Sequence, residues 1–197
     1  MNKKYLALGD SYTIGEGLVK GQRFPDYLAN LLGKEFSEPE VIAVTGWTTA
    51  ELLEGIEVSN LSGRYDLVTL LIGVNNQYRG QTTEQYSDEF TELIELALGF
   101  ADNNPKHVVV VSIPDWGKTP FAADRNVAQI ELEIDLFNAI NQQISLQFEV
   151  NYVDVTELSR MPNVESMLVS DRLHYSEEMY YLWAKKIYKQ IVDFISD

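Results

Sequence analysis

Cysteine is absent from the 197 residues of this chain, and basic residues are scarce. Without thiols, the chain has no disulfide framework, no thiol nucleophile and no thiolate metal site. Its 15 Lys and Arg residues are outnumbered by 30 Asp and Glu residues, which gives a formal net charge of -15. Because phosphate binding needs clustered basic residues, this balance argues against a nucleic-acid partner. We interpret the acidity itself as ordinary solvation of the surface.

Long apolar runs are also missing. The first run, Tyr5 to Leu8, stops before Asp10 and is too short for the core of a signal peptide, and no later stretch approaches the ~20 apolar residues of a membrane-spanning helix. Read as written, the chain is expected to be cytoplasmic, without membrane insertion. Its length and 45% hydrophobic content predict one domain over residues 1–197. The oligomeric state is not indicated by the sequence.

Short β-branched runs alternate with longer segments of helical period, which is typical of a parallel sheet covered by helices on both faces. The predicted strands are Tyr5–Leu8, Val41–Val44, Asp66–Ile72, His107–Ile113 and Val150–Val153. The predicted helices include Phe24–Leu32, a segment from Tyr86 to Ala97, about 123–147, and Glu177–Ile195, the last with Phe194 on its buried side. Thr48 followed by Glu51 predicts a capping box that opens a further helix.

A serine lies where the first predicted strand ends, in Gly9-Asp10-Ser11. A serine hydroxyl becomes a good nucleophile only if a base takes its proton. Near the other end of the chain, Asp171-Arg172-Leu173-His174 supplies an imidazole and a carboxylate that can orient it. We therefore interpret Ser11, His174 and Asp171 as a candidate catalytic triad of nucleophile, base and acid.

Other candidate residues follow the neighbouring predicted strands. Ser11, Gly46 and Asn75 each come after a strand, and in a parallel sheet the ligand crevice lies beyond the strands' carboxyl ends. The backbone N–H groups of Ser11 and Gly46 and the Asn75 side-chain amide are candidate donors to an oxyanion. Aromatic residues on loops at the same edge are candidates for substrate binding: Trp47, Tyr78, Trp116 and Phe121.

Several of these residues also have a purely structural explanation, because Ser, Gly and Asn are frequent in turns for conformational reasons. We interpret Asp10 as an organiser of its loop and His107 as structural. A nucleotide-binding module is disfavoured, because Gly15-Glu16-Gly17 lacks the third glycine of a dinucleotide-binding loop. A metal site made of Asp10, Asp171 and His174 would lack a dedicated ligand spacing, so no metal or cofactor is expected.

Four blocks of the chain together resemble the GDSL esterases and lipases, also called SGNH hydrolases. They are Gly9-Asp10-Ser11, Gly46, Gly73-Val74-Asn75-Asn76 and Asp171-Arg172-Leu173-His174, in that order. The resemblance implies a flavodoxin-like three-layer α/β/α sandwich with a five-stranded parallel sheet. It also implies Ser11 as nucleophile, His174 and Asp171 as its activators, and an oxyanion hole of Ser11, Gly46 and Asn75. The third block usually ends in aspartate, so Asn76 should alter the loop's hydrogen bonds while activity is retained.

This resemblance implies a serine hydrolase that acts on ester bonds. With no sign of a deep lipid tunnel, we expect small, water-soluble esters with short acyl chains as substrates. Two alternatives use the same triad, namely a deacetylase of acetylated sugars and a thioesterase. A third is a non-catalytic ligand-binding protein on the same scaffold.

Overall fold

Five parallel strands form the centre of the protein in a computed structural model that describes residues 2–61 and 63–195. The strands are β1 (Tyr5–Gly9), β2 (Glu40–Ala43), β3 (Leu67–Leu71), β4 (Val108–Val111) and β5 (Asn151–Val153). Their order across the sheet is β2-β1-β3-β4-β5, the flavodoxin-like order. Gly9 pairs in register with Ala43 on one side and Leu71 on the other, so β1, β2 and β3 end level with one another.

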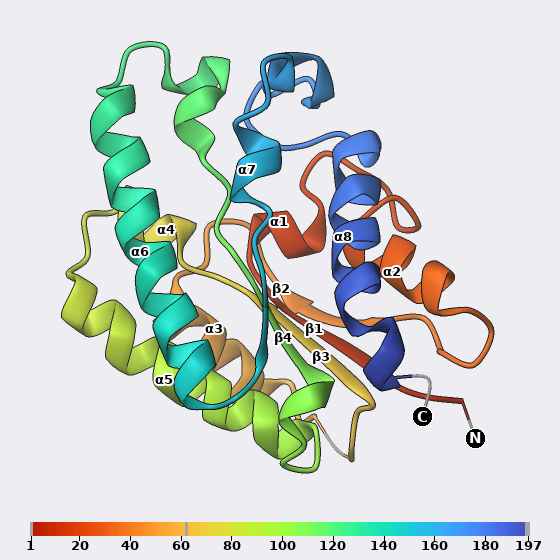
Figure 1. Ribbon diagram of the computed structural model, residues 1–197. Coiled ribbons are helices and arrows are strands. Elements are labelled where there is room, and N and C mark those ends of the chain that lie inside the picture. The colour runs from red at the N-terminus through yellow and green to blue at the C-terminus, as the bar shows by residue number, and fades with distance from the viewer. Residues whose placement is uncertain (1, 62, 196–197) are drawn as a thin grey trace.

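Helices cover both faces of this sheet (Figure 1). On one face α2 (Phe24–Leu32) and α8 (Glu177–Ile195) pack together, and on the other lie α3 (Thr49–Val58), α5 (Thr83–Phe100) and α6 (Val127–Gln147). The shorter helices are α1 (Ser11–Ile14), α4 (Val74–Tyr78) and α7 (Thr156–Ser159), and 3-10 turns span Pro105–His107, Trp116–Lys118, Pro120–Ala122 and Val164–Met167. Because both faces are covered, β1, β3 and β4 are buried along their whole length.

This arrangement confirms the predicted α/β fold and its five strands. The capping box is also present: Glu51 accepts the N–H of Thr48 at 2.7 Å, and the Thr48 hydroxyl accepts the N–H of Glu51. The predicted start of α6 is wrong by four residues, because the chain forms a 3-10 turn at Pro120–Ala122 and the side chain of Asn126 then caps the helix.

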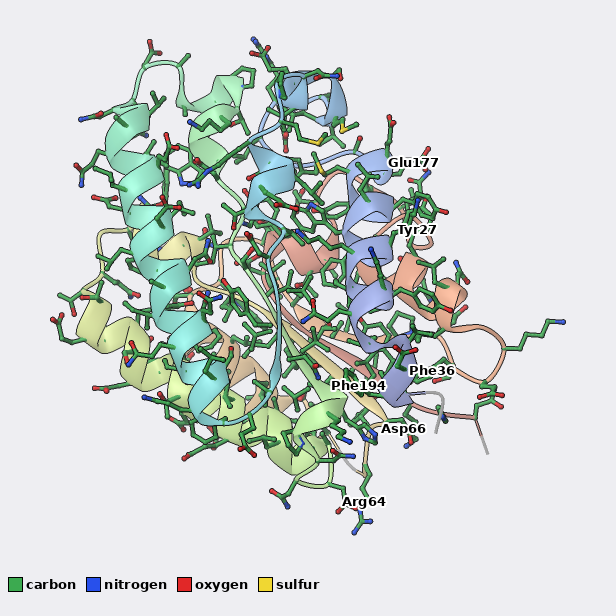
Figure 2. The ribbon with its side chains drawn as sticks, in the orientation of Figure 1. Tyr27, Phe36, Arg64, Asp66, Glu177 and Phe194 are labelled. Atoms are coloured by element: carbon green, nitrogen blue, oxygen red, sulfur yellow. The ribbon has the colours of Figure 1, made fainter. Side chains whose placement is uncertain are left out.

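One residue of the predicted buried face of α8 is misassigned. The side chain of Phe194, labelled in Figure 2, is 42% exposed, whereas Ile195 is 4% exposed. Ile195 lies four residues after Ile191 and therefore continues the buried stripe at the helical period.

Gly9 allows α1 to begin directly against the sheet. A Cβ atom at this position would lie 2.2 Å from the hydroxyl oxygen of Thr13 and 2.4 Å from the carbonyl oxygen of Leu71. Gly9 does not have a positive φ, so glycine is required here for space and not for an unusual backbone conformation. The close approach keeps Ser11 immediately beyond the end of β1.

We expect Gly9→Ala to lower the free energy of unfolding by about 1–3 kcal/mol, because the new methyl group overlaps a backbone oxygen that cannot rotate away. Gly99→Ala is the matched control, since a Cβ atom there, in α5, meets nothing within 4 Å. It should raise the free energy of unfolding by roughly 0.5–1 kcal/mol. Urea denaturation of both variants measures the two values, and similar small changes in both would contradict the steric argument.

Candidate active site

Side chains from five segments of the chain meet around one small cavity at the carboxyl edge of the sheet. Its volume is about 190 Å³, and most of its lining is apolar or aromatic. The lining residues are Ser11, Tyr12, Thr45, Gly46, Val74, Asn75, Tyr78, Trp116, Phe121, Leu173 and His174. Four candidate residues that lie far apart in the sequence therefore line the same cavity: Ser11, Gly46, Asn75 and His174.

Ser11 is the first residue of α1 and is 4% exposed. The sequence pattern had indicated a loop at this place, because a helix of four residues has too little length to show a hydrophobic period. The N–H groups of a helix's first turn lack partners within the helix. Tyr12 N–H donates to the Asp10 carboxylate and Thr13 N–H to the Asp10 carbonyl, whereas Ser11 N–H has no protein acceptor in the described part of the chain.

Asp10 is completely buried beneath the serine. Its Oδ1 accepts the N–H of Tyr12 at 3.0 Å, and its Oδ2 has no hydrogen-bond partner among residues 2–61 and 63–195. Burial raises the pKa of Asp10 to about 7, and the hydrogen bond from Tyr12 offsets only part of this effect. The carboxyl group caps α1, which agrees with its interpretation as a loop organiser.

Asp171 holds His174 through both its side chain and its backbone. Asp171 Oδ2 lies 2.7 Å from His174 Nδ1, and Oδ1 accepts the backbone N–H groups of Leu173 and His174 at 2.8 and 2.9 Å. Partial burial favours a higher pKa for Asp171, but these hydrogen bonds outweigh it and hold the pKa below its ordinary value. The imidazole also packs edge-on against Tyr12, with ring centroids 5.6 Å apart. Asp171 therefore stays ionised beside the imidazole.

Ser11 and His174 face the same cavity, but no hydrogen bond joins the serine hydroxyl to the imidazole within residues 2–61 and 63–195. The Nε2 atom of His174 has no partner in that same part of the chain. Catalytic hydrogen bonds are often long in the absence of a substrate and shorten when one binds. The geometry thus brings nucleophile and base candidates to one space with the imidazole already oriented.

Gly46 lies in a tight turn between β2 and α3. Trp47 N–H donates to the carbonyl of Val44 at 3.2 Å, and Gly46 has a φ of +89°, which the third residue of a type II turn requires. The Gly46 N–H has no acceptor in the described part of the chain. Asn75 donates one side-chain hydrogen to the Trp47 carbonyl at 2.8 Å, which leaves the second amide hydrogen free to bind a ligand.

Asn76 occupies the position where the resemblance leads one to expect aspartate. It is fully buried, and its side chain donates to Thr49 Oγ1 and to Gln81 Oε1, both at 2.6 Å, while it accepts the N–H of Thr49 at 3.2 Å. A carboxylate could accept here but not donate, so the amide suits these partners. Asn76 links the starts of α3 and α4 and takes no part in the cavity.

Three of the four aromatic candidates line the cavity. Trp116 is buried and donates its indole N–H to Gln77 at 2.8 Å. Tyr78 and Phe121 are 46% and 45% exposed, and the ring of each contacts Trp116 edge-on. The fourth, Trp47, lies elsewhere, since its ring covers Gly55 of α3 and is not part of the lining. The exposed rings of Tyr78 and Phe121 form the mouth of the cavity.

Gln77 and Thr45, which sequence analysis did not single out, also support this site, as does Arg79. Gln77 binds Trp116, Thr45 lines the cavity beside Gly46, and Arg79 Nη2 donates to the Gly46 carbonyl at 2.6 Å. The spacing in the sequence could have placed Arg79 near the site, because Arg79 follows Asn75 by one helical turn. The other two are fixed only by the packing of loops, which no spacing in the chain reveals.

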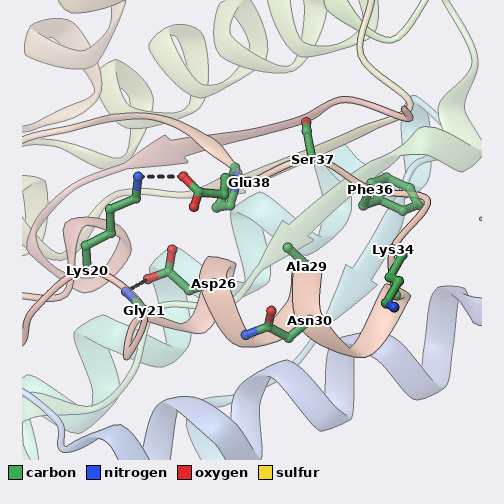
Figure 3. A pocket seen from close by; sticks show the side chains of 11 residues that line it. Lys20, Gly21, Asp26, Ala29, Asn30, Lys34, Phe36, Ser37 and Glu38 are labelled. Atoms are coloured by element: carbon green, nitrogen blue, oxygen red, sulfur yellow. Dashed lines mark hydrogen bonds and ion pairs between the residues drawn. The ribbon is translucent and has the colours of Figure 1, made fainter. Parts of the chain in front are cut away.

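A larger hollow of about 470 Å³ lies between α2 and the segment from Lys34 to Pro39 (Figure 3). Three of its charged side chains already have partners: Lys20 pairs with Glu38 at 2.6 Å, and Asp26 accepts the N–H of Gly21 at 2.8 Å and pairs with Arg23 at 2.7 Å. No histidine is among the described residues that line it. The smaller cavity, which is lined by Ser11 and His174, is therefore the better candidate for an active site.

Two further properties concern residues 2–61 and 63–195. No cluster of three or more His, Asp or Glu side chains in this part of the chain is arranged to hold a metal ion. No helix there combines the length and the apolar character that crossing a membrane would need.

Comparisons with known proteins agree with this fold. Among solved structures, the chain is similar to a member of the lipolytic protein G-D-S-L family from Veillonella parvula (TM-score 0.74, 16% identity, covering 96% of this chain and 98% of that one). It is also similar to the psychrotrophic esterase EstA from a Pseudoalteromonas species (TM-score 0.72, 16% identity, 100% of both chains). A third similar structure is a catalytic mutant of Axe2, an acetylxylan esterase from Geobacillus stearothermophilus (TM-score 0.72, 17% identity, 97% and 95%).

At sequence identities of 16–17%, the structural similarity shows the fold alone. A search of curated protein sequences found no match. The family model, in contrast, covers most of the chain: residues 7–182 match the GDSL-like Lipase/Acylhydrolase family, over a range that includes all four sequence blocks. The chain therefore belongs to the GDSL-like lipase/acylhydrolase family.

Proposed function

We propose that this protein is a serine esterase that hydrolyses small carboxylic esters with short acyl chains. The observation that carries the proposal is the single cavity onto which Ser11, Gly46, Asn75 and His174 all face, with Asp171 bonded to the imidazole. Membership of an acylhydrolase family and the fold shared with esterases support the same reaction class.

In the proposed mechanism, Ser11 Oγ attacks the ester carbonyl carbon and its proton passes to His174 Nε2. The carbonyl oxygen becomes an oxyanion that accepts hydrogen bonds from Ser11 N–H, Gly46 N–H and the Asn75 amide, worth roughly 3 kcal/mol per donor. The alcohol then leaves with the proton from His174, and an acyl-Ser11 ester remains. Water attacks this ester through the same base and releases the acid. Asp171 keeps Nδ1 as the donor and balances the imidazolium charge.

The size of the cavity supports a short acyl group. Its volume of about 190 Å³ is below the ~300–1,000 Å³ of typical small-molecule sites. The bulky rings of Trp116 and Phe121 bound it, so a long acyl chain would have to displace them. We infer a preference for acyl groups of a few carbon atoms.

Acetylated sugars are a second candidate substrate class. The exposed rings of Tyr78 and Phe121 at the mouth offer flat surfaces on which a sugar ring can stack. A similar structure, Axe2, is described as an acetylxylan esterase, which fits this reading. Release of acetate from acetylated xylo-oligosaccharides at a higher kcat/KM than from p-nitrophenyl acetate would favour this class over simple esters.

A serine-directed phosphonate should label the protein at Ser11, because the activated hydroxyl attacks phosphorus as it attacks a carbonyl carbon. We expect Ser11→Ala to lose both the label and turnover of p-nitrophenyl acetate, with kcat reduced by a factor on the order of 10⁴ to 10⁶. Peptide mass mapping locates the adduct. Ser166→Ala, at an exposed serine outside the cavity, is the control and should keep wild-type activity. Unchanged turnover in Ser11→Ala would end the esterase proposal.

The acyl-chain limit should depend on Phe121. With p-nitrophenyl esters of increasing length, we expect kcat/KM to fall beyond butanoate, and Phe121→Ala to shift the optimum toward longer chains because it removes one wall of the cavity. Phe194→Ala is a matched control, because Phe194 is similarly exposed, at 42%, but lies on α8 near the C-terminus (Figure 2). The same chain-length profile in wild type and both variants would refute a size limit set by this ring.

Asp10 has a structural role in this proposal. The pH dependence of the free energy of unfolding tests that role. Its pKa of about 7 in the folded state exceeds the 3.8 of an ordinary aspartate. Between these values the folded protein keeps a proton that the unfolded chain has released, so stability falls as pH rises from about 4 through 7. The full loss is on the order of 4 kcal/mol.

Asp10→Asn removes this titration while Oδ1 can still cap α1. Relative to wild type, its free energy of unfolding should therefore rise by up to about 4 kcal/mol between pH 4 and pH 8. Urea denaturation at several pH values measures the difference, which cancels the contributions of other groups. A difference for Asp10→Asn that stays flat from pH 4 to pH 8 would show that burial of Asp10 does not perturb its titration.

A further inference from the structure

Arg79 connects the two segments that carry Gly46 and Asn75. Its Nη2 donates to the Gly46 carbonyl at 2.6 Å, and its Nη1 lies 3.2–3.3 Å from the two carboxylate oxygens of Glu51. Its backbone N–H donates to the Asn75 carbonyl at 3.0 Å and so closes the last turn of α4. The side chain thus reaches from the end of α4 to the turn after β2.

The contacts around this turn form a closed ring. Three consecutive residues have a backbone group held by a side chain: Gly46 C=O by Arg79, Trp47 C=O by Asn75 at 2.8 Å, and Thr48 N–H by Glu51 at 2.7 Å. Because Glu51 also binds Arg79, the turn, the start of α3 and the end of α4 are tied to one another. Movement of one segment must therefore break at least one of these bonds.

Gly46 needs such support. Its φ of +89° favours glycine, but a residue without a Cβ atom has many other backbone conformations open to it, and a change of conformation would reorient its N–H. A charge-assisted hydrogen bond to the carbonyl of the same residue opposes that rotation. Lysine could supply only a point charge here, whereas the planar guanidinium binds Gly46 and Glu51 at once.

We propose that Arg79 is a positioning residue that fixes the Gly46 N–H and the Asn75 amide relative to each other, so that both donate to the same substrate oxygen. The inference rests on the proposed function, since it concerns the donors to the oxyanion. Arg79 does not line the cavity and does not touch the reacting atoms. It acts through the backbone of Gly46.

A simple surface ion pair is the competing explanation. The side chains of Arg79 and Glu51 are 47% and 38% exposed, and pairs of this kind add little to stability. Glu51→Gln separates the two explanations, because it removes the ion pair while glutamine still serves the capping box. Arg64→Gln is the control for the loss of an exposed arginine, because Arg64 pairs with Asp102 and precedes β3, at the opposite end of the sheet from Ser11 (Figure 2).

We expect Arg79→Gln to lower kcat for p-nitrophenyl acetate roughly 10- to 100-fold, with KM changed by less than about twofold, because misplacing reacting groups slows the chemical step. Arg79→Lys should recover part of this loss. Arg64→Gln should keep wild-type kcat. Glu51→Gln should lose far less than Arg79→Gln, because Arg79 keeps its bond to Gly46 and glutamine keeps the bond to Thr48 N–H. Wild-type kcat in Arg79→Gln, or an equal loss in Glu51→Gln, would overturn the proposal.

Titration with the phosphonate distinguishes positioning from partial unfolding. If Arg79→Gln merely unfolds a fraction of the molecules, fewer chains label at Ser11. The kcat of the untreated variant, calculated per chain that is able to label, then stays at the wild-type value, which would refute the inference. If Arg79 positions the donors, every chain labels, but more slowly, and turnover per site falls. Absence of labelling in the wild type would overturn the proposed function and this inference with it, whereas a labelled wild type with unaffected Arg79→Gln overturns this inference alone.

Discussion

The common edge at which β1, β2 and β3 end is the constraint on which the rest of this molecule depends. Gly9 pairs with Ala43 and with Leu71, so the segments that follow the three strands start side by side. Ser11 consequently lies between the Gly46 turn and α4, which carries Asn75. His174 reaches the same place from the other end of the chain, because Tyr12 of α1 packs against both its imidazole and Trp183 of α8. Without the parallel register, these residues would share no cavity.

The amino-acid sequence was sufficient to predict the strands, the long helices and the residues that meet at this edge, because each depends on local chemistry or on strand order. Apolar runs identify β1 and β3, and the ends of parallel strands must lie together. The short helices α1 and α4 were not predicted, since four or five residues show no helical period. The ring of Trp47 was misplaced for a different reason, because only tertiary packing places it over Gly55.

Charge is distributed unevenly between the surface and this cavity. The chain carries a formal charge of -15, yet the described residues that line the cavity include no Asp, Glu, Lys or Arg. Asp171 reaches the imidazole from outside the lining, and Asp10 is buried below it. An oxyanion formed here would accept hydrogen bonds from neutral N–H donors, and among apolar walls such bonds are stronger than in water. No carboxylate among the described lining residues repels its charge.

Backbone donors also bring a difficulty that side chains must solve. The φ of +89° that this turn requires at position 46 strongly favours glycine, but glycine is the residue least able to keep a peptide group in place. The surrounding side chains of Arg79, Asn75 and Glu51 supply the missing stiffness by binding successive backbone groups. A glycine turn and its side-chain supports therefore form one unit, in which neither part positions a donor alone. This coupling explains why a half-exposed arginine outside the cavity belongs to the proposed site.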